Sequence, residues 1–238
     1  MIIEWGPGLF AAAVAGGYLL GSIPFGVIAT RLGGAGDIRD VGSGNIGATN
    51  VLRTGRKDLA LMTLLGDGGK GALAVLLAWL AVQPEGTPEQ SAVLTSLAGG
   101  AAFLGHLFPV WLKFKGGKGV STFLGTMLAA AWPVGLAAAA TWLVVARMFR
   151  FSSLAALVAV ALAPAIALLL GRPHAIALLA LFMALLVYVR HEENIRRLLK
   201  GQEPKIGAKS PGEPEQMGHN GGPALPPGRF QDPGTPEA

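Results

Sequence analysis

The sequence lacks cysteine and carries little charge. Without cysteine, the 238-residue chain has no disulfide framework and no thiolate for covalent catalysis. Its four histidines stand far apart in the sequence, which argues against a local metal site. Only 14% of the residues are charged and 52% are hydrophobic, while the mean hydropathy is +0.52, values that exclude an ordinary soluble domain. The chain is therefore predicted to be an integral membrane protein.

The few charges also narrow the choice of partners. The formal net charge is +5, but the basic residues stand in short groups between apolar runs and form no stripe suited to nucleic acid. We interpret them as membrane-topology signals. The N-terminus carries Glu4 and no basic region, so we expect the first apolar segment to be retained as a span and not removed as a signal peptide.

Apolar segments long enough to be membrane spans recur along the chain. A bilayer core takes about 20 helical residues. Candidate segments are 8–30, 67–83, 91–112, 119–131, 134–148, 152–170 and 173–190. Segments 119–131 and 134–148 are short and are separated only by Trp132 and Pro133, so they form either one kinked span or two helices.

The distribution of positive charge decides between these alternatives. Cytoplasmic loops collect Lys and Arg. With two helices, one side of the membrane receives Arg39, Arg53, Arg56, Lys57, Lys113, Lys115, Lys118, Arg147, Arg150 and the basic stretch 190–200. The other side receives Glu4, Glu85, Glu89 and, as its one cation, Arg172. The sequence therefore predicts an all-α bundle of seven transmembrane helices, with the N-terminus outside and the C-terminus in the cytoplasm.

The chain divides into two regions by composition. Residues 1–200 contain all the apolar segments and form the predicted membrane domain. Residues 201–238 are rich in Pro, Gly and acids and lack apolar periodicity, so they are predicted to form a disordered cytoplasmic tail.

A first polar motif, VGSGNIGATNVLRTGRK at 41–57, follows the first span. Gly42, Gly44 and Gly47 match a dinucleotide-binding pattern, but no βαβ unit fits between membrane spans. The glycines instead leave backbone N–H groups free to face an anion. Short polar side chains and a guanidinium suited to phosphate are added by Ser43, Asn45, Thr49, Asn50 and Arg53. The alternative is a glycine-rich connecting turn.

A second motif, GHLFPVWLKFKGGKGVST at 105–122, lies between the third and fourth spans. Gly116, Gly117 and Lys118 are predicted to open a helix whose N-terminal N–H groups, dipole and lysine converge on an anion. In the alternative interpretation the lysines only anchor the loop to lipid headgroups. His106 is either a hydrogen-bonded packing residue or a ligand.

Two smaller groups of polar residues remain. In GDGGKG at 66–71, Asp67 is expected to cap the start of the second span, and Lys70 either binds phosphate or extends to the membrane interface. In RHEENIRRLLKG at 190–201, His191 and Asn194 are three residues apart and share one helix face, where they can hold one substrate.

Together, SGNIGATN with Arg53, GHLFP with GGKGVST, and HEENIRRLL resemble the acyl-phosphate:glycerol-3-phosphate acyltransferase family of bacterial membranes, known as PlsY. The resemblance runs from about Gly16 to Gly201. It implies a seven-helix enzyme of the inner membrane that transfers an acyl chain from acyl-phosphate to the sn-1 hydroxyl of glycerol 3-phosphate. The products would be lysophosphatidic acid and inorganic phosphate, in an early step of phospholipid biosynthesis. No cofactor is implied, and a soluble phosphate acyltransferase that makes the acyl-phosphate is a candidate partner.

The resemblance also implies roles for single residues. Ser43, Arg53 and Lys118 match family residues that handle the phosphates, and His191 and Asn194 match those that position the substrates. We expect the Ser43 hydroxyl to donate a hydrogen bond to phosphate and not to be an acylated nucleophile, since no histidine follows nearby. The attacking hydroxyl can lose its proton to His191 or to a substrate phosphate; we favour His191 as a residue that holds substrate. A transporter of a phosphorylated metabolite would use the same anion-binding residues, but transporters tend to place such groups near the membrane midplane and not at one face. A scaffold for lipid-synthesis proteins would leave the three motifs without a purpose.

Overall fold

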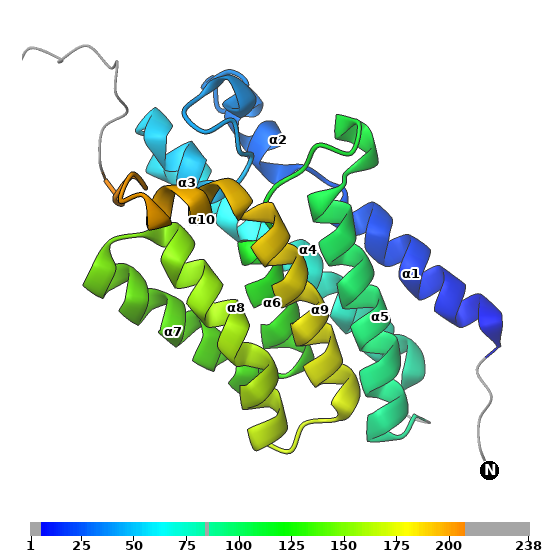
Figure 1. Cartoon of the computed structure of the whole chain (residues 1–238). Coiled ribbons are helices and arrows are strands. Elements are labelled where there is room, and N and C mark those ends of the chain that lie inside the picture. Colours follow the sequence, from blue (N-terminus) through cyan, green and yellow to red (C-terminus); the bar gives the residue numbers. More distant parts are fainter. Residues whose placement is uncertain (1–5, 84–85, 208–238) are drawn as a thin grey trace, which may run out of the picture.

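A computed structural model describes residues 6–83 and 86–207, and within these ranges the chain is helical and has no strand. The long helices pack side by side as a bundle (Figure 1). The α-helices of this part are α1 (Pro7–Gly21), α2 (Phe25–Leu32), α3 (Ala48–Val51), α4 (Lys57–Val82), α5 (Pro88–Leu107), α6 (Val120–Ala130), α7 (Trp132–Phe149), α8 (Ser152–Leu169), α9 (His174–Arg190) and α10 (Glu192–Leu199). Short 3-10 turns are η1 (Ile38–Asp40), η2 (Leu52–Thr54) and η3 (Val110–Leu112).

Several of these helices have the length and composition of membrane spans. In the described residues, five helical segments are long and apolar enough to cross a bilayer, or six if α9 and α10, which are bent by 64° at their junction, count as one span. The first of the five combines α1 with α2, which are separated by a break before Pro24. The remaining apolar helix, α6, has only 11 residues. The prediction of an all-α chain with several candidate membrane spans is confirmed for the described residues.

The chain reverses sharply between α6 and α7. Ala131 is the single residue between the two helices, and its φ and ψ of −154° and 81° lie outside the helical region. A methyl group added to Gly135 would lie 2.5 Å from the backbone nitrogen of Leu128, seven residues earlier. In one continuous helix, seven residues would separate these positions by about 10 Å. Segments 119–131 and 134–148 are therefore two separate helices, as the charge argument predicted.

The second predicted span is too short at its N-terminal side. The sequence placed its start at residue 67, whereas α4 begins at Lys57, just after Gly55, whose φ of 78° ends the preceding turn. Asp67 therefore lies inside the helix and does not cap it. The apolar pattern failed here because Asp67 and Lys70 are polar in sequence but neutralise each other across 2.8 Å.

Small residues let the helices approach closely around a buried core. A methyl group on Gly21 of α1 would lie 2.0 Å from the carbonyl oxygen of Ala102 in α5, so only glycine fits this contact. The largest core cluster joins α5, α6, α7, α8 and α9, and its fully buried side chains include Phe103, Leu107, Phe123, Met127 and Met183.

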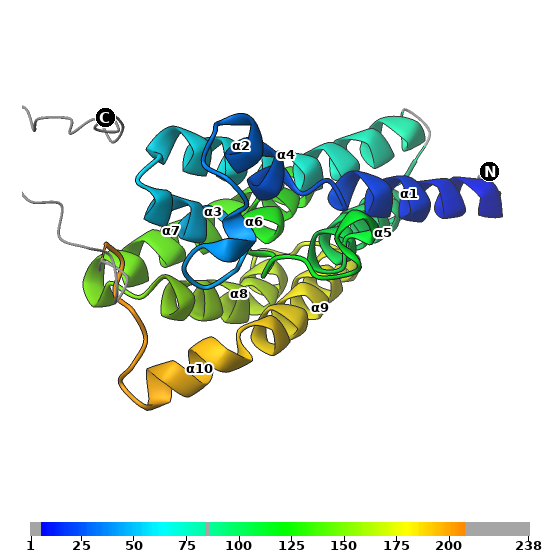
Figure 2. The same ribbon diagram turned by 90° about the horizontal axis from the view of Figure 1, so that it is seen from above.

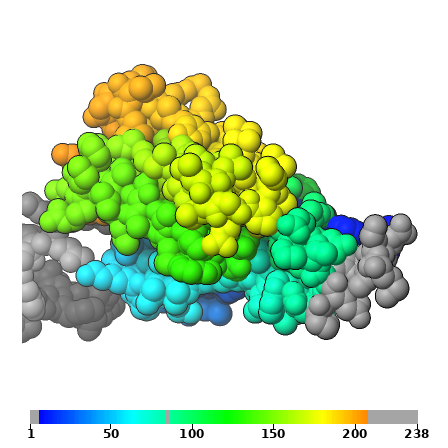
Figure 3. Space-filling model, turned by 90° about the horizontal axis from the view of Figure 1, so that it is seen from below, coloured from blue at the N-terminus to red at the C-terminus, as the bar shows by residue number. Residues whose placement is uncertain are grey.

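The polar motifs gather at one end of the bundle. Figure 1 shows α2, α3 and α10 at the same end, and Figure 2, which looks down on it, places α2 and α3 across from α10. At the opposite end, Figure 3 shows the residues around the α8–α9 turn in yellow beside the green residues around the α6–α7 break. Three motifs that are far apart in the sequence thus come together.

Candidate functional site

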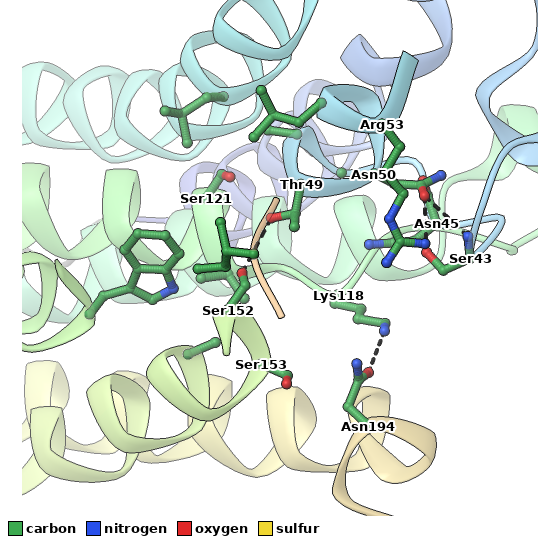
Figure 4. Close-up of a pocket in the computed structure, with 18 of the residues that line it drawn as sticks. Ser43, Asn45, Thr49, Asn50, Arg53, Lys118, Ser121, Ser152, Ser153 and Asn194 are labelled. Carbon is green, nitrogen blue, oxygen red and sulfur yellow. Dashed lines mark hydrogen bonds between the residues drawn. The ribbon is translucent and has the colours of Figure 1, made fainter. Parts of the chain in front are cut away.

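A cavity of about 760 Å³ lies where the three motifs meet. Its polar wall comes from the loop and turn 43–55, from residues 118–121 at the start of α6, and from the α9–α10 junction. Figure 4 shows that Ser43, Arg53, Lys118 and Asn194 point toward the same space from these elements. The segment 203–207, which follows α10, completes the wall.

The first motif is a loop that Asn50 holds together. The Asn50 side chain is buried, and its amide nitrogen donates to the carbonyl oxygens of Val41 and Asn45, both at 2.9 Å, and of Ile38 at 3.2 Å. Its oxygen accepts hydrogen bonds from the backbone N–H and the hydroxyl of Ser43 at 3.1 and 3.2 Å. Asn50 was predicted to bind phosphate directly, but its amide is already fully used by its own loop.

Arg53 reaches the cavity because Gly42 leaves room for it. Gly42 has a φ of 54°, and a methyl group there would lie 2.7 Å from an Arg53 guanidinium nitrogen. Within the described residues, the Arg53 guanidinium makes no hydrogen bond or ion pair. Gly44 also has a positive φ, of 68°, and the side chain of Asn45 lines the cavity. This part of the site can accept an anion.

The second motif is built differently from the prediction. The N–H groups of Gly116 and Gly117 donate to the carbonyl oxygens of Leu107 and His106, both at 3.1 Å, so they are not free to bind an anion. Helix α6 begins at Val120, after Gly119 with a φ of 85°, and not at the paired glycines. Lys118 and the residues at the start of α6, Val120 and Ser121, line the cavity.

Lys118 and Asn194 form a polar chain across the cavity with a residue that the sequence analysis missed. Lys118 donates to the side-chain oxygen of Asn194, whose amide nitrogen donates to Glu203 at 2.6 Å. Glu203 also accepts from Ser153 at 2.7 Å and from Arg197 at 2.8 Å. Burial opposes ionisation of Glu203, but these hydrogen bonds hold the pKa of its carboxyl below the ordinary value. Burial and then the nearby Arg197 lower the pKa of the Lys118 ammonium.

His191 sits at the α9–α10 junction with one defined tautomer. Its Nδ1 lies 2.8 Å from the Val187 carbonyl oxygen, which can only accept, so Nδ1 carries the proton. Burial lowers the pKa of His191 to about 4, so the ring is neutral at pH 7 and its Nε2 is an acceptor. His191 lines the cavity with Asn194, as their spacing predicted.

Lys70 lies outside the cavity wall, contrary to both predictions for it. It is 2% exposed, and its ammonium donates to Asp67 and to the Ile23 carbonyl oxygen, both at 2.8 Å. It does not extend to the membrane interface and faces no open anion site. The pairing with Asp67 makes burial of the charge tolerable.

The other side of the cavity is apolar. It is lined by Leu64, Leu124, Ala139, Trp142 and Leu143, from α4, α6 and α7. Polar cationic groups at one side and hydrocarbon at the other suit an amphipathic molecule with an anionic group. In the residues that the structure describes, no cluster of His, Asp or Glu is placed to hold a metal ion.

Two residues of the site, Glu203 and Arg190, gave only weak signals in the sequence and were not predicted to belong to it. Glu203 stands in a Pro/Gly-rich stretch that was predicted to be a disordered tail, yet residues as far as Ile206 contact the bundle, where the Ile206 N–H donates to the Arg150 carbonyl oxygen at 2.7 Å. The remainder of the predicted tail, 208–238, lies outside the described residues. Arg190 was interpreted as a topology signal, but it binds the carbonyl oxygens of Gly116 and Gly117.

Comparisons with known proteins agree with this geometry. The family model described as glycerol-3-phosphate acyltransferase matches residues 11–201. A glycerol-3-phosphate acyltransferase of Caulobacter vibrioides is 67% identical over 201 residues, which are 84% of this chain and 89% of that protein. One of Rhodospirillum rubrum is 63% identical over 198 residues, 83% of this chain and 91% of that protein.

Solved structures give the same result. The crystal structure of PlsY (YgiH), an integral membrane glycerol 3-phosphate acyltransferase, in its glycerol 3-phosphate form is 38% identical with a TM-score of 0.76, and covers 83% of this chain and 96% of that one. Its lysophosphatidic acid form is 36% identical with a TM-score of 0.74, and covers 83% and 95%. The chain described here therefore belongs to the glycerol-3-phosphate acyltransferase family of membrane enzymes.

Proposed function

We propose that this enzyme transfers a fatty acyl group from acyl-phosphate to the sn-1 hydroxyl of glycerol 3-phosphate, and forms lysophosphatidic acid and inorganic phosphate. The observation that carries the proposal is the convergence of Arg53 and Lys118 on a cavity whose other side is apolar. Both substrates contain phosphate and one contains a long acyl chain, so the two sides of the cavity match the two kinds of group.

Neither Arg53 nor Lys118 forms an ion pair with a carboxylate of the described residues, so both cations are open to a substrate phosphate. Arg53 offers a planar guanidinium, and the Ser43 hydroxyl is held beside it by Asn50. Lys118 contributes a cation whose pKa is lowered mainly by burial, so an arriving phosphate gains a strong electrostatic interaction. Gly42, Gly44, Gly116 and Gly117 act indirectly, through the conformations and close contacts that they permit.

The reaction needs little besides positioning and charge neutralisation. The hydroxyl oxygen of glycerol 3-phosphate attacks the acyl carbonyl carbon, a new C–O bond forms, and the bond between that carbon and the phosphate oxygen breaks. Phosphate leaves with the electron pair of the broken bond. Lys118 and Arg53 stabilise the negative charge that develops on the leaving group. No covalent acyl-enzyme is required, which is consistent with a chain that contains no cysteine.

His191 orients the hydroxyl, and the leaving phosphate is the better final acceptor of its proton. The unprotonated Nε2 can accept a hydrogen bond from the hydroxyl but cannot donate one to phosphate. A ring with a pKa of about 4 is a weak base, whereas the second pKa of a phosphate monoester is about 6. His191 therefore holds the substrate as a hydrogen-bond acceptor.

The site faces the cytoplasm in the orientation that we propose. The end of the bundle with the cavity carries most of the cations outside the spans, including Arg39, Arg56, Lys113 and Lys115, while Arg172 lies in the α8–α9 turn at the other end. With α6 counted as a span, the bundle has seven membrane helices in the bacterial inner membrane, with the N-terminus outside and the C-terminus inside. Residues 1–200 form the proposed membrane domain, and the first part of the proposed cytoplasmic tail 201–238, as far as Ile206, packs against it.

The identity of the donor is tested with competing acyl donors. Purified protein in detergent receives glycerol 3-phosphate together with acyl-phosphate or with acyl-coenzyme A of the same chain length. We expect lysophosphatidic acid only with acyl-phosphate. Equal or faster product formation from acyl-coenzyme A would overturn the donor assignment while leaving the acceptor intact.

The orientation is tested by thiol labelling of this cysteine-free chain. A cysteine introduced at Arg172 is expected to react with an impermeant reagent in intact cells, while one introduced at Lys115 should react only after permeabilisation. The reverse pattern would overturn the proposed topology.

A further inference from the structure

Three ionisable side chains form a buried cluster that the proposed reaction does not use. Asp67 and Lys70 lie in α4 and His106 in α5, and their exposed fractions are 1%, 2% and 3%. Burial of such groups inside an apolar bundle is costly, so clusters of this kind are kept for a structural or functional reason. The cluster borders the cavity, since Asp67 and His106 contribute to its wall.

The cluster is tied to two elements of the fold. The Lys70 ammonium bridges Asp67 and the carbonyl oxygen of Ile23, at the break between α1 and α2, with both distances 2.8 Å. The same Asp67 oxygen lies 3.4 Å from Nδ1 of His106. Nδ1 has no hydrogen-bond partner among the described residues, so its polar contact on this edge of the ring is the ion-pair contact with the Asp67 carboxylate. Asp67 therefore sets the orientation of the His106 ring.

The opposite edge of the His106 ring supports the loop that carries Lys118. A methyl group added to Gly117 would lie 2.2 Å from Nε2 and 2.8 Å from Cε1 of His106, so the glycine packs directly on the ring. The Gly117 N–H also donates to the backbone carbonyl oxygen of His106 at 3.1 Å. The position of the ring thus sets the position of the residue next to Lys118.

Arg190 of α9 holds the same loop from the other side. Its guanidinium donates to the carbonyl oxygens of Gly116 at 2.8 Å and Gly117 at 3.2 Å. It also lies over the ring of Phe108, 5.9 Å from the centroid. The two glycines are therefore clamped between His106 and Arg190, and the next residue projects into the cavity.

We propose that Asp67, Lys70 and His106 are positioning residues that hold Lys118 in the place where it contacts Asn194 and the substrate phosphate. The cluster acts through the His106 ring and Gly117 and touches no reacting atom. The inference rests on the proposed role of Lys118 in the transfer, but the geometry that it claims can be measured without activity. A displacement of about 1 Å at a reacting group can cost 10²-fold in rate, so such support is consequential.

A cross-linking experiment tests the position of the loop directly. In the cysteine-free chain, the substitutions Lys118→Cys and Asn194→Cys place two thiols across the contact between the loop and α10. A short bifunctional methanethiosulfonate reagent should link them rapidly. The control pair Thr49→Cys and Ser152→Cys stands where two hydroxyl oxygens are 3.3 Å apart on elements outside the cluster.

The cluster is then disrupted by Asp67→Asn with Lys70→Met, which removes both charges and leaves no unpaired one buried. We expect the linking rate of the 118/194 pair to fall by roughly tenfold or more, since it follows the effective concentration of the two thiols. The 49/152 pair should be unchanged. Unchanged rates for both pairs, or equal losses at both, would overturn the proposal, because it claims a local effect.

A second variant keeps the test decisive if the double substitution prevents folding. Gly117→Ala leaves the ion pair intact but forces the loop away from the His106 ring, so it should slow the 118/194 pair alone. Made in the chain without the introduced cysteines, the same substitutions should lower kcat/KM by about 10–100-fold. Slower linking without loss of activity would count against Lys118 in catalysis; activity loss at normal linking rates would count against the positioning role.

Discussion

The two glycine-rich loops of the site are stabilised in opposite ways. The loop from Gly42 to Asn50 holds itself, because the Asn50 amide binds carbonyl oxygens of the same loop and of the turn just before it. The loop at Gly116 and Gly117 depends on its neighbours, because its N–H groups are bound by carbonyl oxygens of α5 and its carbonyl groups by Arg190 of α9. In the first loop glycine permits a positive φ, and in the second it permits close packing.

This difference predicts where the effects of mutations come from. Damage to the first loop should stay local, whereas the second loop should respond to changes in helices that never touch substrate. Five predictions extend this comparison, and the substitution expected to lower activity most comes first.

Lys118→Ala should lower kcat/KM by about 10²–10³-fold, the usual effect of removing a group that stabilises developing negative charge. We expect the Lys118→Ala variant to insert and fold normally, since the lysine side chain contributes little to the core. Lys115→Ala is the matched control, because Lys115 belongs to the same loop and is exposed. Near-normal turnover of the Lys118 variant in a detergent assay would reduce the second motif to a loop anchor.

Asn50→Ala should lower kcat/KM by about 10–100-fold through misplacement of Ser43 and Arg53. The buried carbonyl oxygens that lose their donor should relax the loop without unfolding the bundle. Asn50→Asp keeps the shape but cannot donate, so it should be similarly impaired. Full activity of the Asp variant, measured at saturating and limiting substrate, would show that shape alone maintains the loop.

His191→Gln should raise the apparent KM for glycerol 3-phosphate more than it lowers kcat, because glutamine can still accept a hydrogen bond at similar reach. A pKa of about 4 predicts that His191 does not titrate between pH 6 and 8, so the variant and the natural enzyme should have the same pH dependence there. Normal substrate saturation with no turnover would instead indicate general-base catalysis.

The same pKa predicts a stability effect with a defined sign. The folded protein disfavours the imidazolium, since the pKa of His191 falls from an ordinary 6.5 to about 4. Between these values the unfolded state binds more protons, so this contribution is complete above about pH 6.5 and is lost as the pH falls toward 4. His191→Gln should reduce the loss of thermal stability over this range.

Removal of residues 208–238 should have the smallest effect, with activity within about twofold, because a tail of this composition lacks the apolar groups needed to pack. Truncation after Gln202 is the control, since it also removes Glu203 and its bonds to Asn194 and Arg197. The shorter form should be clearly less active. A large loss in the longer form would give the tail a role in catalysis or assembly.

Much of the fold could be read from the sequence because membrane spans are signalled by length, hydropathy and charge. The start of α4 could not, because the pairing of Asp67 with Lys70 is a property of three-dimensional contact. Residues 119–131 and 134–148 were separated correctly only by the charge argument, since either segment alone is ambiguous. In the structure, the two helices are separated by the sharp reversal of the chain at Ala131.

For the site, the sequence identified the residues that gather around the cavity, but not which of them keep their polar groups free to bind substrate. Arg53 and Lys118 face the cavity as predicted, whereas Asn50, Gly116 and Gly117 use their polar groups within the protein. Glu203 was missed because its partners lie on α8 and α10, and a single carboxylate in a Pro/Gly-rich stretch gives no local signal.

The most direct test of the central claim measures both products in one sample. Purified protein receives acyl-phosphate and glycerol 3-phosphate, and lysophosphatidic acid and inorganic phosphate are followed over time. We expect the two products to form in equal amounts, neither to accumulate above the uncatalysed rate without glycerol 3-phosphate, and both to be lost in Lys118→Ala. Absence of lysophosphatidic acid, or enzyme-dependent phosphate release without glycerol 3-phosphate, would contradict it.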